Sequence, residues 1–153
     1  MKKMKNLFIR EARIIDSERI IEFQKKMALE TENIILDHDT INQGVHAVFA
    51  DPHKGKYYVA ECDNEVIGSL LITYEWSDWR NSFVWWIQSV YIQPDHRRQG
   101  VFKEMYRHVR EIAMQNLVAG LRLYVEIENI KAQKTYEAMG MNGTHYRMYE
   151  WFK

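Results

Sequence analysis

The chain has 153 residues, a length that suits one domain with its own hydrophobic core. Hydrophobic residues make up 46% of it and aromatic residues 13%, a composition that excludes a disordered chain. Lys and Arg total 21, as do Asp and Glu, and the resulting formal net charge of +0 argues against a broadly basic surface for nucleic acid or a membrane.

Cysteine and histidine usage predicts a protein without disulfides or bound metal. Cys62 is the only cysteine, which rules out an internal disulfide, and the six histidines show no metal-ligand spacing. The apolar run that follows the basic residues 1–6 is too short for a signal-peptide core. No apolar stretch approaches membrane-spanning length, so a cytoplasmic location and no membrane partner are expected.

The first half of the chain alternates between strand and helix patterns, which differ in the spacing of their apolar residues. The elements predicted here are, in order, a strand over 7–13, a helix capped by Asp16 or Ser17, an irregular stretch over 30–39, a helix over 40–49, and strands over 57–62 and 66–74. A tight turn at 63–65 makes the last two strands a hairpin. Ile20, Ile21, Phe23, Met27 and Ala28 form the apolar side of the first helix.

The second half predicts two helices among three strands. In order they are a strand over 83–92, a helix over 100–116, a strand over 121–127, a helix from Asn129 stopped by Gly140, and a last strand over 144–152. The strand over 83–92 is apolar on both faces, which is typical of the middle of a covered sheet. The strand–helix–strand run over 83–127 predicts a parallel pair joined by a right-handed crossover. The whole order describes one mixed α/β domain over 1–153, with a central sheet flanked by helices.

The most informative stretch is residues 90–102, where an apolar strand runs through a proline and a basic turn into a helix opened by one glycine. The first backbone N–H groups of a helix have no partner within it and carry a partial positive charge, so a helix N-terminus binds anions. Arg97 and Arg98 add fixed charge and forked donors for phosphate. The stretch therefore predicts a phosphate-bearing ligand at a strand–turn–helix junction.

Two motifs in this order resemble the GCN5-related (GNAT) family of N-acetyltransferases. The family's acyl-CoA signature is Gln or Arg, two residues, Gly, one residue, then Gly or Ala, and residues 97–102 read RRQGVF. Residues 129–141, NIKAQKTYEAMGM, are similar to the Asn, Ala, Tyr, Gly spacing of the family's last helix. The expected element order matches the family's over nearly the whole chain. The resemblance implies the GNAT acyl-CoA N-acyltransferase fold and acetyl-CoA as the acetyl donor.

Two positions depart from the family's pattern. Phe102 stands where the family usually has Gly or Ala, which either narrows the pyrophosphate site or is tolerated because backbone groups grip the phosphates. Gln88 stands where related enzymes often carry a glutamate, and a glutamine cannot accept a proton at neutral pH. The proton acceptor must then be another group, or act through water.

The resemblance implies an acyl-CoA site built from the end of one strand and the following turn. Backbone N–H groups of the turn and its two arginines would hold the pyrophosphate, and the backbone of Val90 and Ile92 would pair with the pantetheine amides as an added strand does. A backbone N–H there would also stabilise the oxyanion that develops on the thioester carbonyl. The implied cofactor-binding residues are Val90, Tyr91, Ile92, Arg97, Arg98, Gln99, Gly100, Val101, Phe102, Lys103, Asn129 and Tyr136.

Two proton transfers accompany acetyl transfer to an amine. Tyr136 occupies the position that often protonates the leaving thiolate in the family, although a core tyrosine with a bonded hydroxyl fits the same pattern. Asn129 either bonds the cofactor arm or caps the last helix. A carboxylate must take a proton from the acceptor ammonium, and Glu30 and Glu32 are favoured over Asp37, Glu75 and Asp78, although any one of them alone would more often be a solvated surface group.

Tryptophans concentrate in one hairpin, at positions 76, 79, 85 and 86. Trp85 and Trp86 point to opposite faces of their strand, so one belongs in the core. The predicted acceptor site combines Trp76, Trp79 and Trp86 with Glu30 and Glu32, a set of aromatic faces and acids that suits a small cationic amine. Core packing or a dimer contact explains the tryptophans equally well.

The sequence therefore predicts an N-acetyltransferase that transfers an acetyl group from acetyl-CoA to a primary amine of a small molecule or peptide by direct attack. The alternative is a non-catalytic acyl-CoA-binding sensor, which the glutamine at position 88 supports. A nucleic-acid module is disfavoured by the neutral charge. The acceptor, the length of the acyl group and the oligomeric state stay open, with a homodimer compatible with the exposed aromatic residues.

Overall fold

The computed structural model describes residues 6–153, so most of the basic N-terminal stretch lies outside the described residues. The chain divides into two compact units, of which the first ends at Arg122 and the second comprises Leu123–Lys153. The single domain predicted over 1–153 stays a prediction. Within the described residues, no helix combines the length and the apolar character needed to cross a membrane.

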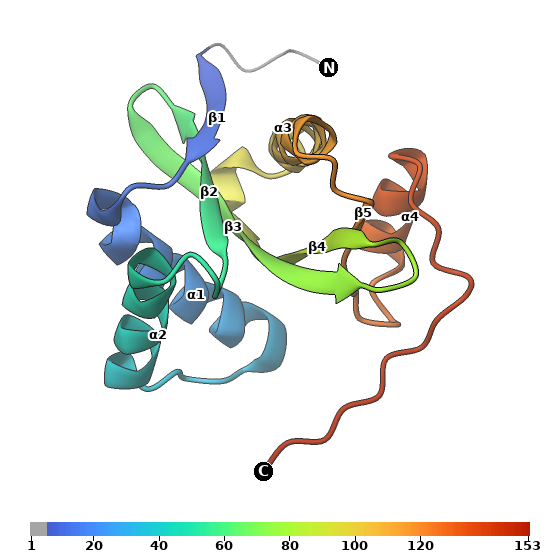
Figure 1. Ribbon diagram of the computed structural model, residues 1–153. Coiled ribbons are helices and arrows are strands. Elements are labelled where there is room, and N and C mark those ends of the chain that lie inside the picture. The colour runs from blue at the N-terminus through green and yellow to red at the C-terminus, as the bar shows by residue number, and fades with distance from the viewer. Residues whose placement is uncertain (1–5) are drawn as a thin grey trace. The chain divides into compact units, whose positions relative to one another are not determined.

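The first unit is built on a mixed sheet, as predicted, which has five strands instead of the six expected (Figure 1). Its strands are β1 (Leu7–Glu11), β2 (Lys56–Cys62), β3 (Glu65–Ser77), β4 (Ser82–Ile92) and β5 (Gly120–Arg122), and they lie side by side in that order. The first four pair antiparallel, and β5 pairs parallel with β4. A parallel pair needs a long crossover, which the helix between β4 and β5 supplies.

Helices cover both faces of this sheet. Successive residues of a strand point to opposite faces, so neighbours on β2 identify the helices on each side. Tyr57 stacks on Phe49 of α2 (His38–Ala50), with ring centroids 5.7 Å apart, whereas Tyr58 meets His108 of α3 (Val101–Gln115) at 5.8 Å. The helix α1 (Ser17–Glu32) lies on the α2 side, and α3 covers the other face (Figure 1).

The apolar spacing of the sequence predicted the buried helix faces correctly. Ile20, Ile21 and Phe23 of α1 are buried, and the first two form a cluster with Val45, Tyr57 and Val59. On the other face, α3 buries Val101, Met105 and Val109, which recur at helical spacing. Burial of side chains of this size contributes about 2 kcal/mol each, which is why the period of the pattern fixes the orientation of each helix.

Several details of the predicted secondary structure are wrong. Residues 144–152 form no strand, and β5 ends at Arg122 instead of reaching residue 127. Alternating apolar residues report which faces a strand would bury, but a strand also needs a paired neighbour, and the ladder of β5 with β4 stops at Arg122. Residues 30–32 are not irregular, because α1 continues to Glu32 and ends at Asn33, which adopts the left-handed conformation with φ 54°.

Asp16 fastens the start of α1 to β1. Its two carboxylate oxygens accept hydrogen bonds from Arg10 at 2.7 and 3.0 Å, and the backbone N–H of Arg13 donates to it at 2.7 Å. Its side chain is only 7% exposed, so these bonds replace lost hydration. The Arg10 guanidinium therefore holds the pKa of the Asp16 carboxyl below its ordinary value, against the opposing effect of burial.

We expect the Asp16→Asn variant to lose about 2 kcal/mol of unfolding free energy at pH 7, because Arg10 is left partly buried without its main charge partner. A carboxyl with a lowered pKa in the folded state stabilises the protein above its unfolded pKa, near 4, and this contribution is lost as the pH falls through the folded value. The difference between wild type and variant should therefore shrink below about pH 4. Urea unfolding at pH 7 and pH 3 measures it, and a constant difference at both would contradict the assignment.

Candidate active site

The strand β4 carries a β-bulge in its second half. Ser69 pairs with Tyr91 and Leu71 pairs with Gln88, so β4 has one residue more than β3 between these pairs. Ser89 in this interval adopts the left-handed conformation, with φ 51°. A bulge leaves one residue unpaired and turns the backbone, and such bulges are frequent beside active sites. Sequence reasoning missed Ser89, because a bulge of this kind has no fixed residue pattern.

The bulged half of β4 also has an open edge. One edge of β4 pairs with β3 along most of the strand. The other edge pairs with β5, but only in the first half of β4, at Val84, Trp85 and Trp86. Within the described residues, no strand pairs with the outer edge over residues 87–92. The predicted pantetheine positions Val90 and Ile92 lie on this stretch, where an extended amide-bearing ligand can add to the sheet.

The basic turn after β4 contains two residues in the left-handed conformation. It begins with a short 3-10 helix (Pro94–His96) and reaches α3 through Arg98 and Gly100, which are both left-handed with φ 63° and 83°. Left-handed residues among right-handed ones direct successive N–H groups into one concavity, which is an anion-binding arrangement. The first turn of α3 adds its unpaired N–H groups and the positive end of the helix dipole.

The two arginines of the turn have different surroundings. Arg98 is exposed, as are Gln99 and Lys103, and Gln99 Nε2 donates to the Asp95 carbonyl at 2.7 Å. Arg97 instead folds back onto β4, where its Nε donates to the Ile92 carbonyl at 2.7 Å. The residues predicted to hold the pyrophosphate are therefore contiguous, but the Arg97 guanidinium already has protein partners.

Phe102, which departs from the family pattern, is half-buried in the first turn of α3. Its ring centroid lies 6.5 Å from that of Tyr106, one turn further along the helix. The ring thus packs along the helix surface, an arrangement that leaves the backbone groups of the turn as the main donors.

Gln88 belongs to a polar cluster on the α1 side of the sheet. Its Nε2 donates to Thr73 Oγ1, and two residues along β4 from Gln88, Trp86 pairs with both Thr73 and Arg122. Arg122 reaches across to an ion pair with Glu75 of β3. These residues share one face, since paired residues and residues two apart on a strand point the same way. The sequence pattern predicted Trp86 here, but Thr73 and Arg122 gave no signal of their own.

The three predicted acceptor-site tryptophans are not brought together. Trp76 pairs with Phe83 on the opposite face of the sheet from Trp86, with ring centroids 5.1 Å apart, and is 55% exposed. Trp79 lies in the β3–β4 turn and is 91% exposed. Only Trp86 shares a face with Gln88 and Glu75.

The two predicted carboxylates of α1 lie in its last turn. Glu32 is exposed at the helix end. Glu30 accepts a hydrogen bond from the Tyr91 hydroxyl at 3.1 Å and forms an ion pair with Arg97 at 2.7 Å. Glu30 thus contacts Tyr91 and Arg97, two of the residues predicted to bind acyl-CoA.

The second unit contains the helix α4 (Ile130–Ala138) and the second motif. Asn129 caps this helix, since its side chain accepts from the Ala132 N–H at 3.1 Å. Tyr136 lies on the half-buried side of α4 with Ala132, and burial raises the pKa of its hydroxyl. A tyrosine with a raised pKa stays protonated through the neutral range, as a proton donor must.

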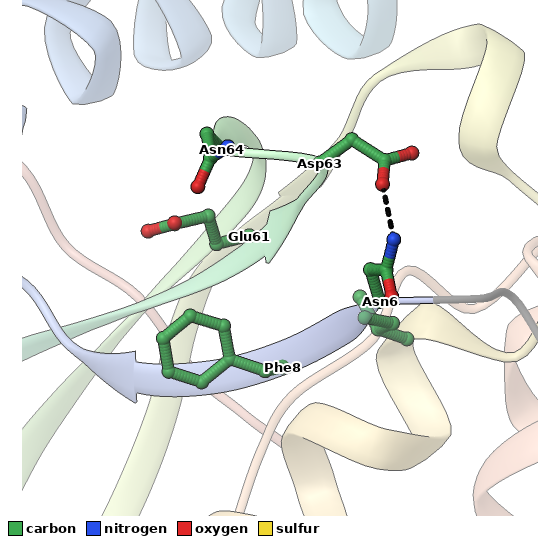
Figure 2. A pocket seen from close by; sticks show the side chains of 6 residues that line it. Asn6, Phe8, Glu61, Asp63 and Asn64 are labelled. Atoms are coloured by element: carbon green, nitrogen blue, oxygen red, sulfur yellow. Dashed lines mark hydrogen bonds between the residues drawn. The ribbon is translucent and has the colours of Figure 1, made fainter.

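A separate hollow of about 380 Å³ lies beside the β2–β3 turn (Figure 2). Asn6 donates to Asp63 at 2.7 Å across it, and Figure 2 shows Phe8 of β1 and Glu61 of β2 beside them. Its lining contains two acids and no basic side chain, which is unsuited to a phosphate-bearing ligand. None of the predicted site residues lines this hollow, and we assign it no part in the predicted site.

Comparison with known proteins places these features in a family context. Residues 17–141 match the model of the acetyltransferase (GNAT) family. The chain is 42% identical to the crystal structure of a possible acetyltransferase from Clostridium difficile 630, with a TM-score of 0.88 over 97% of this chain and 99% of that one.

More distant relatives share part of the sequence or the fold alone. Thialysine N-epsilon-acetyltransferase of Bos taurus is 29% identical over 75 residues, which are 49% of this chain and 44% of that protein. The match thus spans less than half the length of that relative. A ribosomal-protein-alanine N-acetyltransferase from Brucella melitensis biovar Abortus 2308 superposes with a TM-score of 0.78 over 96% of this chain and 99% of that one, at 14% identity.

Proposed function

Since the chain belongs to the acetyltransferase (GNAT) family, we propose that it transfers an acetyl group from acetyl-CoA to a primary amine of a small molecule or peptide. The observation that carries the proposal is the turn before α3, in which Arg98 and Gly100 are both left-handed. Glycine adopts this conformation freely, whereas Arg98 is strained in it, and strained non-glycine backbone clusters at ligand sites because the surrounding structure must hold it in place. The donor set of the turn suits a pyrophosphate.

The donor site is assigned to the turn and the open edge of β4. Backbone N–H groups over residues 98–103 hold the pyrophosphate, with Arg98 as the exposed cation. Val90 and Ile92 pair with the amides of the pantetheine arm at the bulged edge. Acetyl-CoA supplies an activated thioester when bound, and a backbone N–H at the bulge stabilises the negative charge that develops on its oxygen.

Tyr136 is assigned as the proton donor to the leaving thiolate. The assignment rests on the position of Tyr136 in the second motif and on its raised pKa, which keeps the proton on the hydroxyl. Asn129 belongs to the same motif, and its role is to fix the start of α4 through its bond with the Ala132 N–H. Direct transfer follows: the C–N bond forms, the C–S bond breaks, and the thiolate takes the Tyr136 proton. The new amide nitrogen releases its extra proton to water, and water returns a proton to Tyr136.

The acceptor side is assigned to the face that carries Gln88, Trp86 and Glu75, together with the end of α1. The amine attacks only after it loses a proton, and a carboxylate such as Glu75 or Glu32 takes that proton through water. Trp86 offers an aromatic surface to a cationic amine. The curated relative that acts on thialysine supports a side-chain amine as the acceptor class.

The test is continuous thiol release from acetyl-CoA with a panel of primary amines. The panel contains thialysine, lysine and a short lysine peptide, each with an Nε-acetylated counterpart as the matched control. We expect turnover with at least one free amine, an acetylated product with a mass increase of one acetyl group, and no release with the blocked counterpart. Saturable acetyl-CoA binding without turnover on any amine would contradict the proposal.

A non-catalytic acyl-CoA sensor is the second candidate. The observation that favours it is Gln88, which donates to Thr73 at the position where related enzymes often carry a glutamate. A glutamine cannot accept a proton at neutral pH, and a protein that only binds acyl-CoA needs no proton acceptor at this position. The same assay separates the two, since a sensor binds acetyl-CoA stoichiometrically and releases no thiol with any amine.

A further inference from the structure

Glu30 joins three elements that meet at the end of β4. Its Oε2 accepts a hydrogen bond from Arg97 Nη2 at 2.7 Å, and its Oε1 accepts from the Tyr91 hydroxyl at 3.1 Å. Glu30 belongs to the last turn of α1, Tyr91 to β4, and Arg97 to the turn before α3. A single carboxylate thus uses both oxygens on the strand and turn of the donor site.

Arg97 is held on its other sides as well. Its Nε donates to the Ile92 carbonyl at 2.7 Å, and its guanidinium carbon lies 5.2 Å from the centroid of the Tyr91 ring. Tyr91 in turn stacks on Phe23 of α1, with ring centroids 5.0 Å apart. The Arg97 side chain is therefore fixed by a charge, a carbonyl and an aromatic face, which together define one conformation.

Stability alone explains this arrangement poorly. The side chains of Glu30 and Arg97 are each 40% exposed, and an ion pair this exposed contributes little to folding. The residue after Arg97, however, is Arg98 with φ 63°, a conformation that is uncommon for a long, non-glycine side chain and costs free energy. Arg97 directly precedes Arg98, and its bonds to Glu30 and Ile92 fix the chain just before the strained residue.

We propose that Glu30 is a positioning residue for acyl-CoA binding, which holds Arg97 against β4 and so keeps the turn over residues 97–100 in its anion-binding conformation. The proposal rests on the assignment of that turn to the pyrophosphate. Glu30 is then not the proton acceptor that its place in the sequence suggested. The last turn of α1 is at the same time tied to the donor site, so acetyl-CoA binding and the position of this helix end depend on each other.

The experiment is a double-mutant cycle on the dissociation constant of CoA, measured by isothermal titration calorimetry. We expect Glu30→Gln to weaken CoA binding about 10-fold and Arg97→Gln to weaken it by a similar factor. The double variant should bind CoA no more weakly than either single variant, because both substitutions remove the same ion pair. The kcat of Glu30→Gln at saturating acetyl-CoA should stay within about twofold of wild type, with the same pH profile.

Glu22→Gln is the matched control. Glu22 lies two turns earlier on α1, is also 40% exposed and is ion-paired with Arg19 and Lys26. Within residues 6–153, no hydrogen bond or ion pair joins it to β4 or to the turn. We expect its CoA affinity to match the wild type. Equal melting temperatures of the two glutamine variants would exclude a general loss of stability as the cause.

Three results would overturn the proposal. Unchanged CoA affinity with a lowered kcat and an altered pH profile would make Glu30 a proton acceptor. Tighter binding in Glu30→Gln would show that Glu30 only competes with phosphate for Arg97. Additive losses in the double variant would show two independent contributions. Failure of the proposed function is distinct, because the wild-type protein would then release no thiol with any amine, whatever the CoA affinities of the variants.

Discussion

The Gly100→Val variant is expected to bind acetyl-CoA about 100-fold more weakly than the wild type. Gly100 precedes the first residue of α3 and has φ 83°, in the left-handed region. A β-branched residue is a rare outlier there, at a cost of roughly 1–2 kcal/mol, so the variant relaxes toward a right-handed backbone. The relaxation turns the N–H groups of the turn away from one another, and the added side chain occupies the space that a phosphate approaches.

Calorimetric titration with acetyl-CoA measures this loss. Gly140→Val is the matched control, since Gly140 has nearly the same conformation, φ 88°, at the end of α4, and a side chain there meets no atom within 4 Å. It carries a similar backbone strain without altering the turn, so it separates strain from site geometry. An affinity within about threefold of wild type in Gly100→Val would mean that the turn does not hold the pyrophosphate.

The Tyr136→Phe variant is expected to lose roughly 100- to 10,000-fold in kcat, the range that a positioned proton donor contributes. The phenyl ring keeps the packing of α4, so acetyl-CoA affinity should stay within about twofold of wild type. Because burial raises the Tyr136 pKa, its hydroxyl stays protonated as the pH rises past its ordinary value of 10. Tyr136 should therefore impose no descending limb on the wild-type rate profile below about pH 10.

Steady-state kinetics with a saturating amine measures both parameters. Tyr124→Phe, a change of the same kind in the same unit outside the motif, serves as the comparison for solubility and folding. A decrease of less than about threefold in kcat for Tyr136→Phe would support the alternative interpretation, in which this tyrosine is a packing residue with a bonded hydroxyl.

Most elements of the first unit could be predicted from the sequence, because each has a distinct apolar period. The helix face of Ile20, Ile21 and Phe23 and the face of Val101, Met105 and Val109 are buried as their spacing predicts. The apolar residues over 144–152 predicted a strand that does not form. A strand pattern in the sequence does not indicate whether a neighbouring strand is present to pair with it.

The donor site was predictable where it depends on local chain chemistry. Pro94, the paired arginines and Gly100 lie within seven residues, and a glycine before a helix directly indicates a left-handed position. The acceptor site was less predictable, because its residues come from different strands. Trp76 and Trp86 were expected to act together, and the register of β3 and β4 places them on opposite faces.

The sequence by itself determined the mixed α/β class, the family and the basic turn at a helix start, because all three are written in local spacing and composition. Only the tertiary structure decided the bulge at Ser89, the left-handed Arg98 and the bonds of Glu30 to Arg97 and Tyr91. Glu30 and Arg97 are separated by 67 positions, and no local pattern encodes a contact across that distance. Such contacts arise when the packing of α1 on the sheet brings the two side chains together.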